Sequence, residues 1–249
     1  MSYMTILPPR VLIICAGDGT RWGDYLGAPK HFAPINGEPI LHRTVRLVRE
    51  VSPMSPVFVI TPRGDTEEDT REALVRYAVT GAQTRTAELT PELRDADKFA
   101  SSRHLWAKVG RTVVIYGDTY LTHAAVRAVM NPLPLLDGWG MVARWGASAI
   151  TGTPWGENLA LVLDPVAHDL VWDAITRVPS MTSGWMGGRC GGSEIYMLLE
   201  TGDPCQYSRQ GPHGIHVDDW SDDFDYPADY DRWCERYALA SEELRRRAQ

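Results

Sequence analysis

The sequence predicts an α/β protein built around a largely parallel sheet, and two observations support that prediction. Apolar runs rich in β-branched residues recur at 11–16 (VLIICA), 57–61 (VFVIT) and 112–117 (TVVIYG), and buried parallel strands have this continuous apolar composition. A turn and a segment with helical spacing follow each run, which is the alternation of βα units. With 249 residues and 44% hydrophobic content, we expect one compact domain over 1–249.

The segments between these predicted strands carry apolar residues at helical spacing. The first predicted helix lies at about 40–50, the second runs from about 66 to 81, and the third covers about 97–109. A shorter helix is expected to begin near Thr122. Each of these helices would connect one strand of the sheet to the next.

The second half of the chain has a looser pattern. Further strands are expected at GMVARW (140–145) and LALVLD (159–164), followed by a helix that begins at Asp164 with Pro165 in its first turn. The glycine-rich span from Thr182 to Gly192 has no apolar periodicity and predicts a flexible loop over a site. The tail predicts a C-terminal helix at about 227–248.

Charge and composition exclude several classes of function. The net charge of −7 argues against general nucleic-acid binding, which depends on lysine and arginine neutralising phosphates. We expect no membrane association, because no signal peptide opens the chain and no apolar stretch approaches the roughly 20 residues that span a bilayer. The four cysteines lack the close spacing of a zinc or redox motif, so we expect reduced thiols and a cytoplasmic protein.

The stretch after the first predicted strand carries the strongest functional signal. Residues 15–39 read CAGDGTRWGDYLGAPKHFAPINGEP, and a glycine-rich turn after a parallel strand can direct backbone amides at an anion. The turn is neither a P-loop nor a dinucleotide-binding GxGxxG. Arg21 offers a planar fork for phosphate and Lys30 a compact positive charge, so the stretch indicates a site for a phosphorylated ligand.

These residues resemble the signature of the sugar-phosphate and alcohol-phosphate nucleotidyltransferases, A-x-G-x-G-T-R followed by P-K-x-x-x-P-x-x-G-x-P-I-L. Two later stretches extend the resemblance: VVIYGDTYLT is similar to the family's central strand ending in Gly-Asp, and DDFDYPADYDRW is similar to its late D-x-D-T-P-E-D-L pattern. The resemblance implies a Rossmann-like three-layer αβα sandwich with a mixed, mostly parallel sheet of the GT-A type. It also implies a nucleotide-binding half at about 8–120 and an acceptor-binding half at about 121–230.

The resemblance further implies which residues perform the chemistry. The residues expected to act catalytically are Arg21, Lys30 and Asp118. Those expected at the nucleotide are Ala16, Gly17, Asp18, Gly19, Thr20, Arg21, Lys30, Ser101 and Ser102. Asp118, Asp223 and Asp225 are the expected ligands of Mg²⁺ or Mn²⁺, which prefer oxygen donors. Arg189 and Glu194, beside the glycine-rich span, are candidates for the acceptor.

The implied reaction is metal-dependent nucleotidyl transfer from a nucleoside triphosphate to a sugar 1-phosphate or similar acceptor, with release of pyrophosphate. Tyr226 and Ala228 stand where the family has Thr and Glu, and Trp22 stands where it commonly has Met or Leu, so the nucleotide and the acceptor stay open. Two alternatives are a glycosyltransferase that uses a nucleotide-sugar donor and a nucleotide-binding regulator without turnover. The glycosyltransferase class usually has a second acidic residue where this chain has Tyr120. A homodimer is also left open.

Each candidate residue also has a simpler structural interpretation. Lys30 could be a solvated surface residue, and Asp118 could cap the helix that begins near Thr122. Asp225 belongs to an acidic stretch that could be solvated or could cap a helix. His213, with His216 near carboxylates, could indicate a metal site, although a structural histidine is the more common case.

Overall fold

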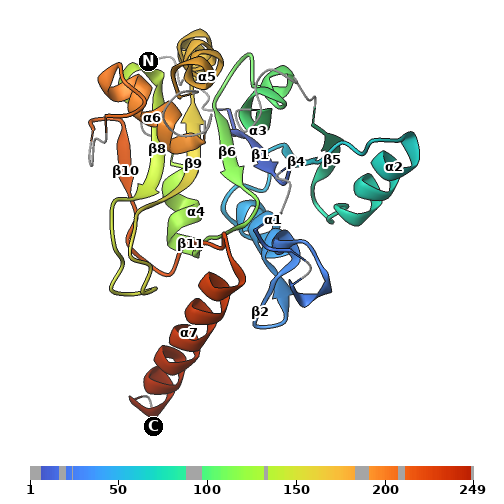
Figure 1. The fold of residues 1–249 in the computed structure, drawn as a ribbon, viewed down its shortest axis with the longest axis vertical. Coiled ribbons are helices and arrows are strands. Elements are labelled where there is room, and N and C mark those ends of the chain that lie inside the picture. The colour runs from blue at the N-terminus through green and yellow to red at the C-terminus, as the bar shows by residue number, and fades with distance from the viewer. Residues whose placement is uncertain are drawn as a thin grey trace, which may run out of the picture.

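The computed structural model describes residues 7–16, 21–23, 25–87, 97–131, 134–182, 191–206 and 211–247. A seven-stranded sheet in the order β10-β8-β9-β6-β1-β4-β5 forms its centre (Figure 1). Its strands are β1 (Arg10–Ile14), β4 (Val57–Thr61), β5 (Gln83–Thr86), β6 (Thr112–Tyr116), β8 (Trp139–Arg144), β9 (Glu157–Leu163) and β10 (Gly214–His216). Two small antiparallel pairs lie outside it, β2 (Pro34–Ile35) with β3 (Glu38–Pro39), and β7 (Thr119–Tyr120) with β11 (Asp222–Asp223).

The sheet is mixed and mostly parallel, as predicted. Strand β9 runs antiparallel to both of its neighbours, β6 and β8, whereas β1 pairs in parallel with β4 and β6. Ile14 aligns with Ile60 on one side and with Tyr116 on the other. The carboxyl ends of these strands therefore meet at one edge, from which the loops carrying the predicted site residues leave.

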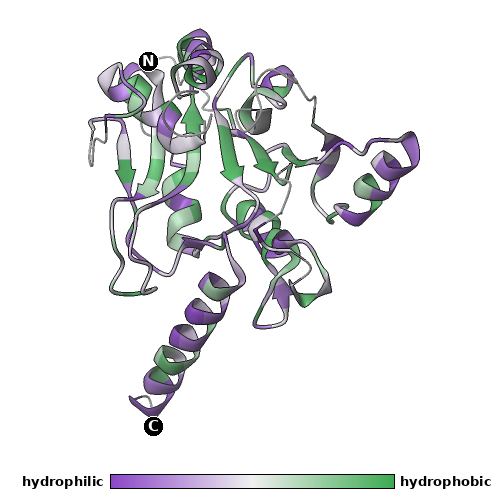
Figure 2. Cartoon of the chain, in the orientation of Figure 1, coloured by the Kyte–Doolittle hydropathy of each residue, from purple (hydrophilic) through white to green (hydrophobic). Residues whose placement is uncertain are grey.

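Helices cover both faces of the sheet, which confirms the three-layer arrangement (Figure 1). Side chains of α1 (Ile40–Val51) and α4 (His123–Val129) pack on one face. Those of α3 (Asp97–Ala100), α5 (His168–Thr182) and α6 (Gly192–Thr201) pack on the other. Hydrophobic residues concentrate in the strands, and α7 (Pro227–Arg247), which projects from the body, is largely hydrophilic along its length (Figure 2).

The helix predicted at 66–81 begins as expected and ends early. Thr66 caps α2 (Glu67–Arg76), since its Oγ1 accepts from the Asp69 amide at 3.1 Å and the Asp69 carboxylate accepts from the Thr66 amide at 3.1 Å. The helix stops before Gly81: Tyr77 is its C-cap, and the next amide, that of Ala78, donates to the Val75 carbonyl three residues back at 3.2 Å, which ends the α-helical pattern.

The helix predicted at 97–109 is wrong beyond its first turn. α3 ends at Ala100, and a 3₁₀ turn follows at Arg103–Leu105. The hydroxyl of Ser102 donates to the Phe99 carbonyl at 3.0 Å, and the Ser102 amide donates to the same oxygen at 3.3 Å. A continuing α-helix would use that carbonyl for residue 103, so the serine closes the helix through local hydrogen bonds.

Three other predicted elements have different outcomes. The helix predicted from Asp164 starts there as a 3₁₀ turn: Asp164 is the N-cap residue of Pro165–Ala167, which leads into α5 at His168, and its carboxylate accepts from Arg111 Nε at 2.9 Å. Gly192 begins α6, a helix that sequence reasoning missed, while residues 183–190 of the predicted loop lie outside the described residues. The C-terminal helix is confirmed as α7.

Candidate active site

The candidate site forms where the sheet edge meets the β7/β11 pair. β7 follows directly on the Gly117-Asp118 turn at the end of β6, and β11 lies beside it with Asp223 opposite Thr119. This pairing places Asp222 and Asp223 beside the residues that follow β6. The resemblance to the family's sequence pattern predicts this proximity. Asp118 and Asp223 thus come from distant parts of the chain and lie next to each other.

A buried aromatic cluster lies among the segments that carry the site residues. Trp22 follows Arg21, Ala33 and Ile35 follow Lys30, Tyr120 follows Asp118, and Phe224 lies between Asp223 and Asp225; all five belong to one buried cluster with Ile40, Tyr230 and Trp233. Trp22 and Tyr230 meet edge to face with centroids 5.9 Å apart, and Tyr120 packs on Trp233 at 4.6 Å. Because buried aromatic packing is rigid and energetically large, this cluster fixes the relative positions of the charged side chains.

Two cations and two carboxylates form a chain of ion pairs at the site. Lys30 Nζ contacts Asp118 Oδ2 and lies 3.6 Å from Asp225 Oδ1, and Arg21 Nη1 lies 2.5 Å from Asp225 Oδ2. Only 9% of the Lys30 side chain is exposed. Burial alone would lower the pKa of Lys30, but the carboxylates of Asp118, Asp223 and Asp225 raise it above its ordinary value. Lys30 is therefore a permanent buried cation.

The glycine of the Gly117-Asp118 turn permits the close approach of β1. A Cβ at Gly117 would lie 2.4 Å from Cys15 Sγ and 2.8 Å from the Ile14 carbonyl oxygen, and the Gly117 amide donates to that oxygen at 2.9 Å. No side chain fits there without displacing the end of β1. The turn therefore holds Asp118 close to the end of β1 and to Cys15, which follows it.

Asp223 contributes a carboxylate that lacks its full set of partners. Its Oδ1 is shielded from solvent and has no hydrogen-bond partner among the described residues. Burial raises the pKa of Asp223 well above its ordinary value, the charge of Asp118 raises it further, and Lys30 opposes the rise. A buried polar atom without a partner is uncommon in native structures, and it indicates a place that a ligand can complete.

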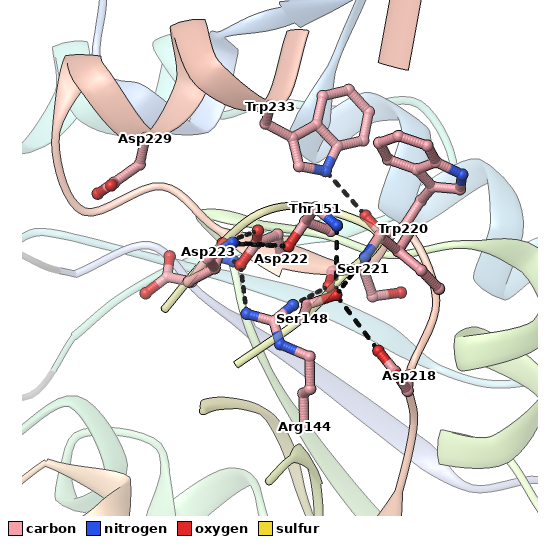
Figure 3. Close-up of polar contacts among 12 residues, drawn as sticks. Arg144, Ser148, Thr151, Asp218, Trp220, Ser221, Asp222, Asp223, Asp229 and Trp233 are labelled. Atoms are coloured by element: carbon pink, nitrogen blue, oxygen red, sulfur yellow. Dashed lines mark hydrogen bonds and ion pairs between the residues drawn. The ribbon is translucent and has the colours of Figure 1, made fainter. Parts of the chain in front are cut away.

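A buried ion pair anchors β11 to the main sheet, and sequence reasoning missed it. Arg144 Nη2 binds Asp222 Oδ1 at 2.9 Å, with both side chains no more than 2% exposed, and Arg144 Nη1 donates to the Ser221 carbonyl at 2.9 Å (Figure 3). Thr153 Oγ1 donates to Asp222 Oδ2 at 2.5 Å. Because side chains alternate along a strand, fixing Asp222 turns Asp223 the other way, toward the site. The sequence signal that could have indicated this ion pair is the arginine at the end of the apolar run GMVAR.

The structure brings together five of the predicted site residues: Arg21, Lys30, Asp118, Asp223 and Asp225. Ala16 is partly buried just after β1, and Glu194 is 8% exposed in the first turn of α6. Ser101 and Ser102 are fully buried, and Ser102 has the local role described above. The remaining predicted residues lie outside the described part of the chain: Gly17, Asp18, Gly19, Thr20 and Arg189.

The structure distinguishes the simpler interpretation from the functional one for three residues. Lys30 is buried and ion-paired, so it is not a solvated surface residue. Asp118 does not cap α4, because Thr122 Oγ1 itself accepts from the Ala125 amide at 3.0 Å. His213 is structural: its ring stacks on Trp139 with centroids 4.1 Å apart and contacts Glu200 Oε1 at 3.0 Å.

The carboxylates of the site are the kind of ligand that a divalent cation prefers, but the described residues do not form a complete set of metal ligands. Within the described ranges, no group of three or more His, Cys, Asp or Glu side chains is arranged to hold a metal ion. Asp118 and Asp225 nevertheless face one lysine, with the unpartnered oxygen of Asp223 beside them. Mg²⁺ commonly takes one or two carboxylates and completes its shell with phosphate oxygens and waters, so this donor set fits it.

A cleft of about 810 Å³ opens beside Lys30. It lies between the segment 22–32 and α2, and its walls include Phe32, Arg63, Arg76 and Tyr77. Small-molecule sites are commonly about 300–1,000 Å³ with a few placed polar groups on apolar walls. The cleft is therefore large enough for a nucleotide-sized ligand that reaches Lys30.

Comparison with known proteins decides the family. Residues 11–149, more than half of the chain, match the model of the MobA-like NTP transferase domain. The chain belongs to the MobA-like NTP transferase domain family. The matched range contains most of β1, residues 17–20, the Gly-Asp turn and β8, so Arg21, Lys30 and Asp118 of this NTP transferase domain all lie within it. Asp222, Asp223 and Asp225 lie beyond it.

The relatives of this NTP transferase domain are nucleotidyltransferases. It is 31% identical over 204 residues to the 2-C-methyl-D-erythritol 4-phosphate cytidylyltransferase of Burkholderia cenocepacia strain HI2424, covering 78% of the chain and 75% of that enzyme. It is also 31% identical over 115 residues to the bifunctional protein GlmU of Chromobacterium violaceum, covering 46% of the chain but only 23% of GlmU. Family membership places the chain among the nucleotidyltransferases.

Solved structures share the fold of this NTP transferase domain at low sequence identity. UDP-glucose pyrophosphorylase complexed with UDP-glucose matches with a TM-score of 0.59 at 11% identity, covering 94% of this chain and 100% of that one. The CTP:phosphocholine cytidylyltransferase LicC of Streptococcus pneumoniae matches with a TM-score of 0.56 at 14% identity, covering 92% and 99%. Both confirm the Rossmann-like NTP-transferase fold. No helix in the described part of the chain is long and apolar enough to cross a membrane.

Proposed function

We propose that this protein transfers a nucleotidyl group from a nucleoside triphosphate to a sugar 1-phosphate or a similar phosphorylated acceptor and releases pyrophosphate. The observation that carries the proposal is the ion-paired group of Arg21, Lys30, Asp118 and Asp225 at the carboxyl edge of β1 and β6. Phosphate-binding cations and metal-binding carboxylates are both present there, on a domain of the MobA-like family.

The reaction joins an oxygen of the acceptor phosphate to the α-phosphorus of the triphosphate. The bond from the α-phosphorus to the bridging oxygen breaks, and the electron pair leaves with pyrophosphate. Such chemistry depends on positioning and on neutralising negative charge. Lys30 supplies a fixed positive charge at the reacting phosphate, and Arg21, whose side chain is 49% exposed, binds phosphate oxygens further out.

Asp118 and Asp225, with Asp223 beside them, are the residues that would hold Mg²⁺ or Mn²⁺. A bound divalent cation supplies neutralisation of phosphate charge during transfer. For these carboxylates to hold the cation, Lys30 and Arg21 would exchange their carboxylate partners for phosphate oxygens of the substrate. The ion pairs of the ligand-free site therefore keep both sets of charges in position until substrate arrives.

We further propose that residues of about 8–120 bind the nucleotide and those of about 121–230 bind the acceptor. The cleft beside Lys30 is lined only by residues between Trp22 and Tyr77. This position supports the assignment of nucleotide binding to about 8–120. The second part has a pocket of about 60 Å³ lined by Arg144, Glu157, Asn158 and Ser193, which is smaller than the roughly 300–1,000 Å³ of a small-molecule site, so the acceptor half rests on the family resemblance alone. Burial raises the pKa of Glu157 to about 9, with Asp223 and Asp222 adding to the rise, so its carboxyl is a neutral donor near pH 7.

The proposal is tested by following pyrophosphate with Mg²⁺, each NTP and a panel of phosphorylated acceptors. The panel contains glucose 1-phosphate, inositol 1-phosphate, 2-C-methyl-D-erythritol 4-phosphate and phosphocholine. Acceptor-dependent release is expected with at least one pair. Lys30→Ala is expected to lower kcat/KM about 100- to 1,000-fold, as loss of a preorganised donor does.

The matched control is Lys108→Ala, because Lys108 is exposed and lies away from the ion-paired group; its activity should equal that of the wild type. Release that ignores the acceptor, or that survives Lys30→Ala, would contradict the assigned roles. Hydrolysis of nucleotide sugars without any pyrophosphate release would instead support the glycosyltransferase alternative. Tight nucleotide binding without turnover would support the regulator.

A further inference from the structure

The cleft beside Lys30 contains two arginines that the mechanism above does not use. Arg63, in the turn after β4, and Arg76, in the last turn of α2, both line it. Both residues are exposed, and no ion pair among the described residues engages either guanidinium group. Arg71, on the same helix, differs in both respects, because it pairs with Glu68 at 3.1 Å and lies outside the cleft walls.

The turn that carries Arg63 is fixed against the start of α2. A Cβ at Gly64 would lie 2.3 Å from Asp69 Cβ and 2.7 Å from the Thr70 amide nitrogen, so only glycine permits the turn to pack this closely. The Gly64 amide donates to Thr70 Oγ1 at 3.2 Å. The backbone beside Arg63 is therefore held next to the helix that carries Arg76.

Arg76 is held relative to Lys30 through its neighbour in the chain. Tyr77, the C-cap residue of α2, is 4% exposed, and its Oη lies 3.1 Å from His31 Nδ1. Its ring also meets that of Phe32 with centroids 5.0 Å apart. Because His31 follows Lys30 directly, these contacts join the end of α2 to the segment that carries the buried cation.

The charges along the cleft favour an anion. Three cations and two carboxylates line it: Lys30, Arg63, Arg76, Asp69 and Glu72. The Asp69 carboxylate already accepts from the Thr66 amide at 3.1 Å and from Thr66 Oγ1 at 2.7 Å, so the helix cap engages one of the two carboxylates. The planar fork of a guanidinium group matches two oxygens of a phosphate.

These charges also determine which end of a nucleoside triphosphate enters the cleft. Lys30 belongs both to the ion-paired group and to the cleft wall. A triphosphate whose α-phosphate lies at Lys30 can therefore extend one end between the segment 22–32 and α2. That end is either the uncharged nucleoside or the β- and γ-phosphates, which carry most of the negative charge. Charge complementarity selects the phosphates.

We propose that Arg63 and Arg76 bind the β- and γ-phosphates of the nucleoside triphosphate and hold the pyrophosphate as it leaves. This inference rests on the proposed nucleotidyl transfer and assigns its leaving group to the cleft. When the bond from the α-phosphorus to the bridging oxygen breaks, the electron pair passes to pyrophosphate. The two guanidinium groups neutralise the charge that develops there.

The test measures the binding of pyrophosphate by calorimetry, with Mg²⁺ present, in Arg63→Gln and Arg76→Gln. The Kd for pyrophosphate should rise about tenfold in each variant, which is the lower end for loss of a hydrogen bond to a charged group. The Kd values for AMP, CMP, GMP and UMP should equal those of the wild type, because a nucleoside monophosphate lacks the phosphates that the arginines contact. The thermal midpoints should not change, since both side chains are exposed.

The matched control is Arg71→Gln, which removes a charge from the same helix outside the cleft and should bind pyrophosphate as the wild type does. Equal losses of pyrophosphate affinity in Arg71→Gln and Arg76→Gln would show a general effect of surface charge and would overturn the inference. Unchanged pyrophosphate binding in both cleft variants would also overturn it. Weaker binding of the monophosphates alone would place the nucleoside in the cleft instead.

Failure of the proposed function gives a different result. A wild-type protein that releases no pyrophosphate with any pair of NTP and acceptor contradicts nucleotidyl transfer, and that outcome involves neither arginine. An active wild-type enzyme whose pyrophosphate binding is the same in Arg63→Gln and Arg76→Gln contradicts only the site assigned to the leaving group.

Discussion

Lys30 is the residue on which the charge balance of the ligand-free site depends. Asp118, Asp223 and Asp225 surround it and raise its pKa against the effect of burial. Removing one partner of a buried ion pair costs more than the pair itself contributes, because the remaining charge stays buried without compensation. Lys30 therefore serves both the proposed chemistry and the stability of the site.

Lys30→Met should destabilise the ligand-free protein by about 3 kcal/mol, at the low end for a buried pair because Asp118 is 15% exposed and Asp225 is 34% exposed. Urea unfolding at neutral pH measures the change. The double variant Lys30→Met/Asp118→Asn should lose less than the sum of its single variants. A Lys30→Met protein as stable as the wild type would show that the carboxylates do not depend on this cation.

We expect His168, far from the site at the start of α5, to make the stability of the protein depend on pH. Its ring lies 5.1 Å from that of Trp106, and its Nε2 is buried without a described partner. Burial lowers the pKa of His168, while Asp169 opposes the effect. The unfolded chain therefore takes up a proton at a higher pH than the folded one, and stability falls as pH decreases through the unfolded value.

His168→Phe keeps a ring against Trp106 and removes the titrating group. The free energy of unfolding of the wild type should fall by more than that of the variant between about pH 7 and about pH 5. Denaturant titrations at the two pH values measure the difference. Equal losses in the two proteins would exclude His168 as the source.

At the scale of elements, the short β7/β11 pair determines where the acidic stretch lies. A two-residue strand is too short to be stable by itself, so β11 depends on the buried Arg144–Asp222 pair and on the aromatic cluster around Trp233 (Figure 3). Arg144 and Trp233, the central residues of these two supports, are both distant in sequence from Asp118. The position of Asp223 and Asp225 is thus a tertiary property of the fold.

Arg144→Met should destabilise the protein by about 3–5 kcal/mol, because Asp222 is left buried and unpaired. Arg144→Met/Asp222→Leu should recover much of that loss, since two apolar residues leave no buried charge. Chemical unfolding of both variants and the Asp222→Leu single variant gives the coupling energy. Additive losses would contradict a direct, energetically important pair.

The predictable elements were those fixed by local pattern. The apolar runs predicted β1, β4 and β6, and the helical segment after Thr66 predicted the start of α2. The helix at 97–109 failed because Ser102 diverts the Phe99 carbonyl, a choice that apolar spacing does not encode. The short strands β5, β7, β10 and β11 form only by pairing with strands elsewhere in the chain. Helix α6 was missed because the glycine-rich sequence before it gives no signal for a helix start.

The residues of the candidate site also divide into those that a local motif predicts and those that only the fold positions. Arg21, Lys30, Asp118 and the Asp-x-Asp pair could be found because their motifs keep a fixed order along the chain. Arg144 lies inside an apolar strand run, where an apolar side chain is the default expectation. Its importance depends on Asp222, which the fold places beside it. The loop at 17–20 stays a prediction, since it lies outside the described residues.

At the scale of the whole molecule, the protein has a net charge of −7, and the substrates of the proposed reaction are also negatively charged. Long-range attraction therefore cannot concentrate them, and recognition depends on local cations at the sheet edge. The three-layer fold supplies that edge: loops after β1 and β6 meet there, and β11 returns from the C-terminal part to join them (Figure 1). The central claim is that this edge transfers a nucleotidyl group.

The most direct test incubates the wild-type protein with Mg²⁺, an acceptor and an NTP radiolabelled at the α-phosphorus, and follows the label. The account predicts that the label moves into a product containing both nucleotide and acceptor, in equal amount to the pyrophosphate released, and that Lys30→Ala slows the transfer about 100- to 1,000-fold. Label recovered as free nucleoside monophosphate, or left in the NTP with every acceptor, would contradict it.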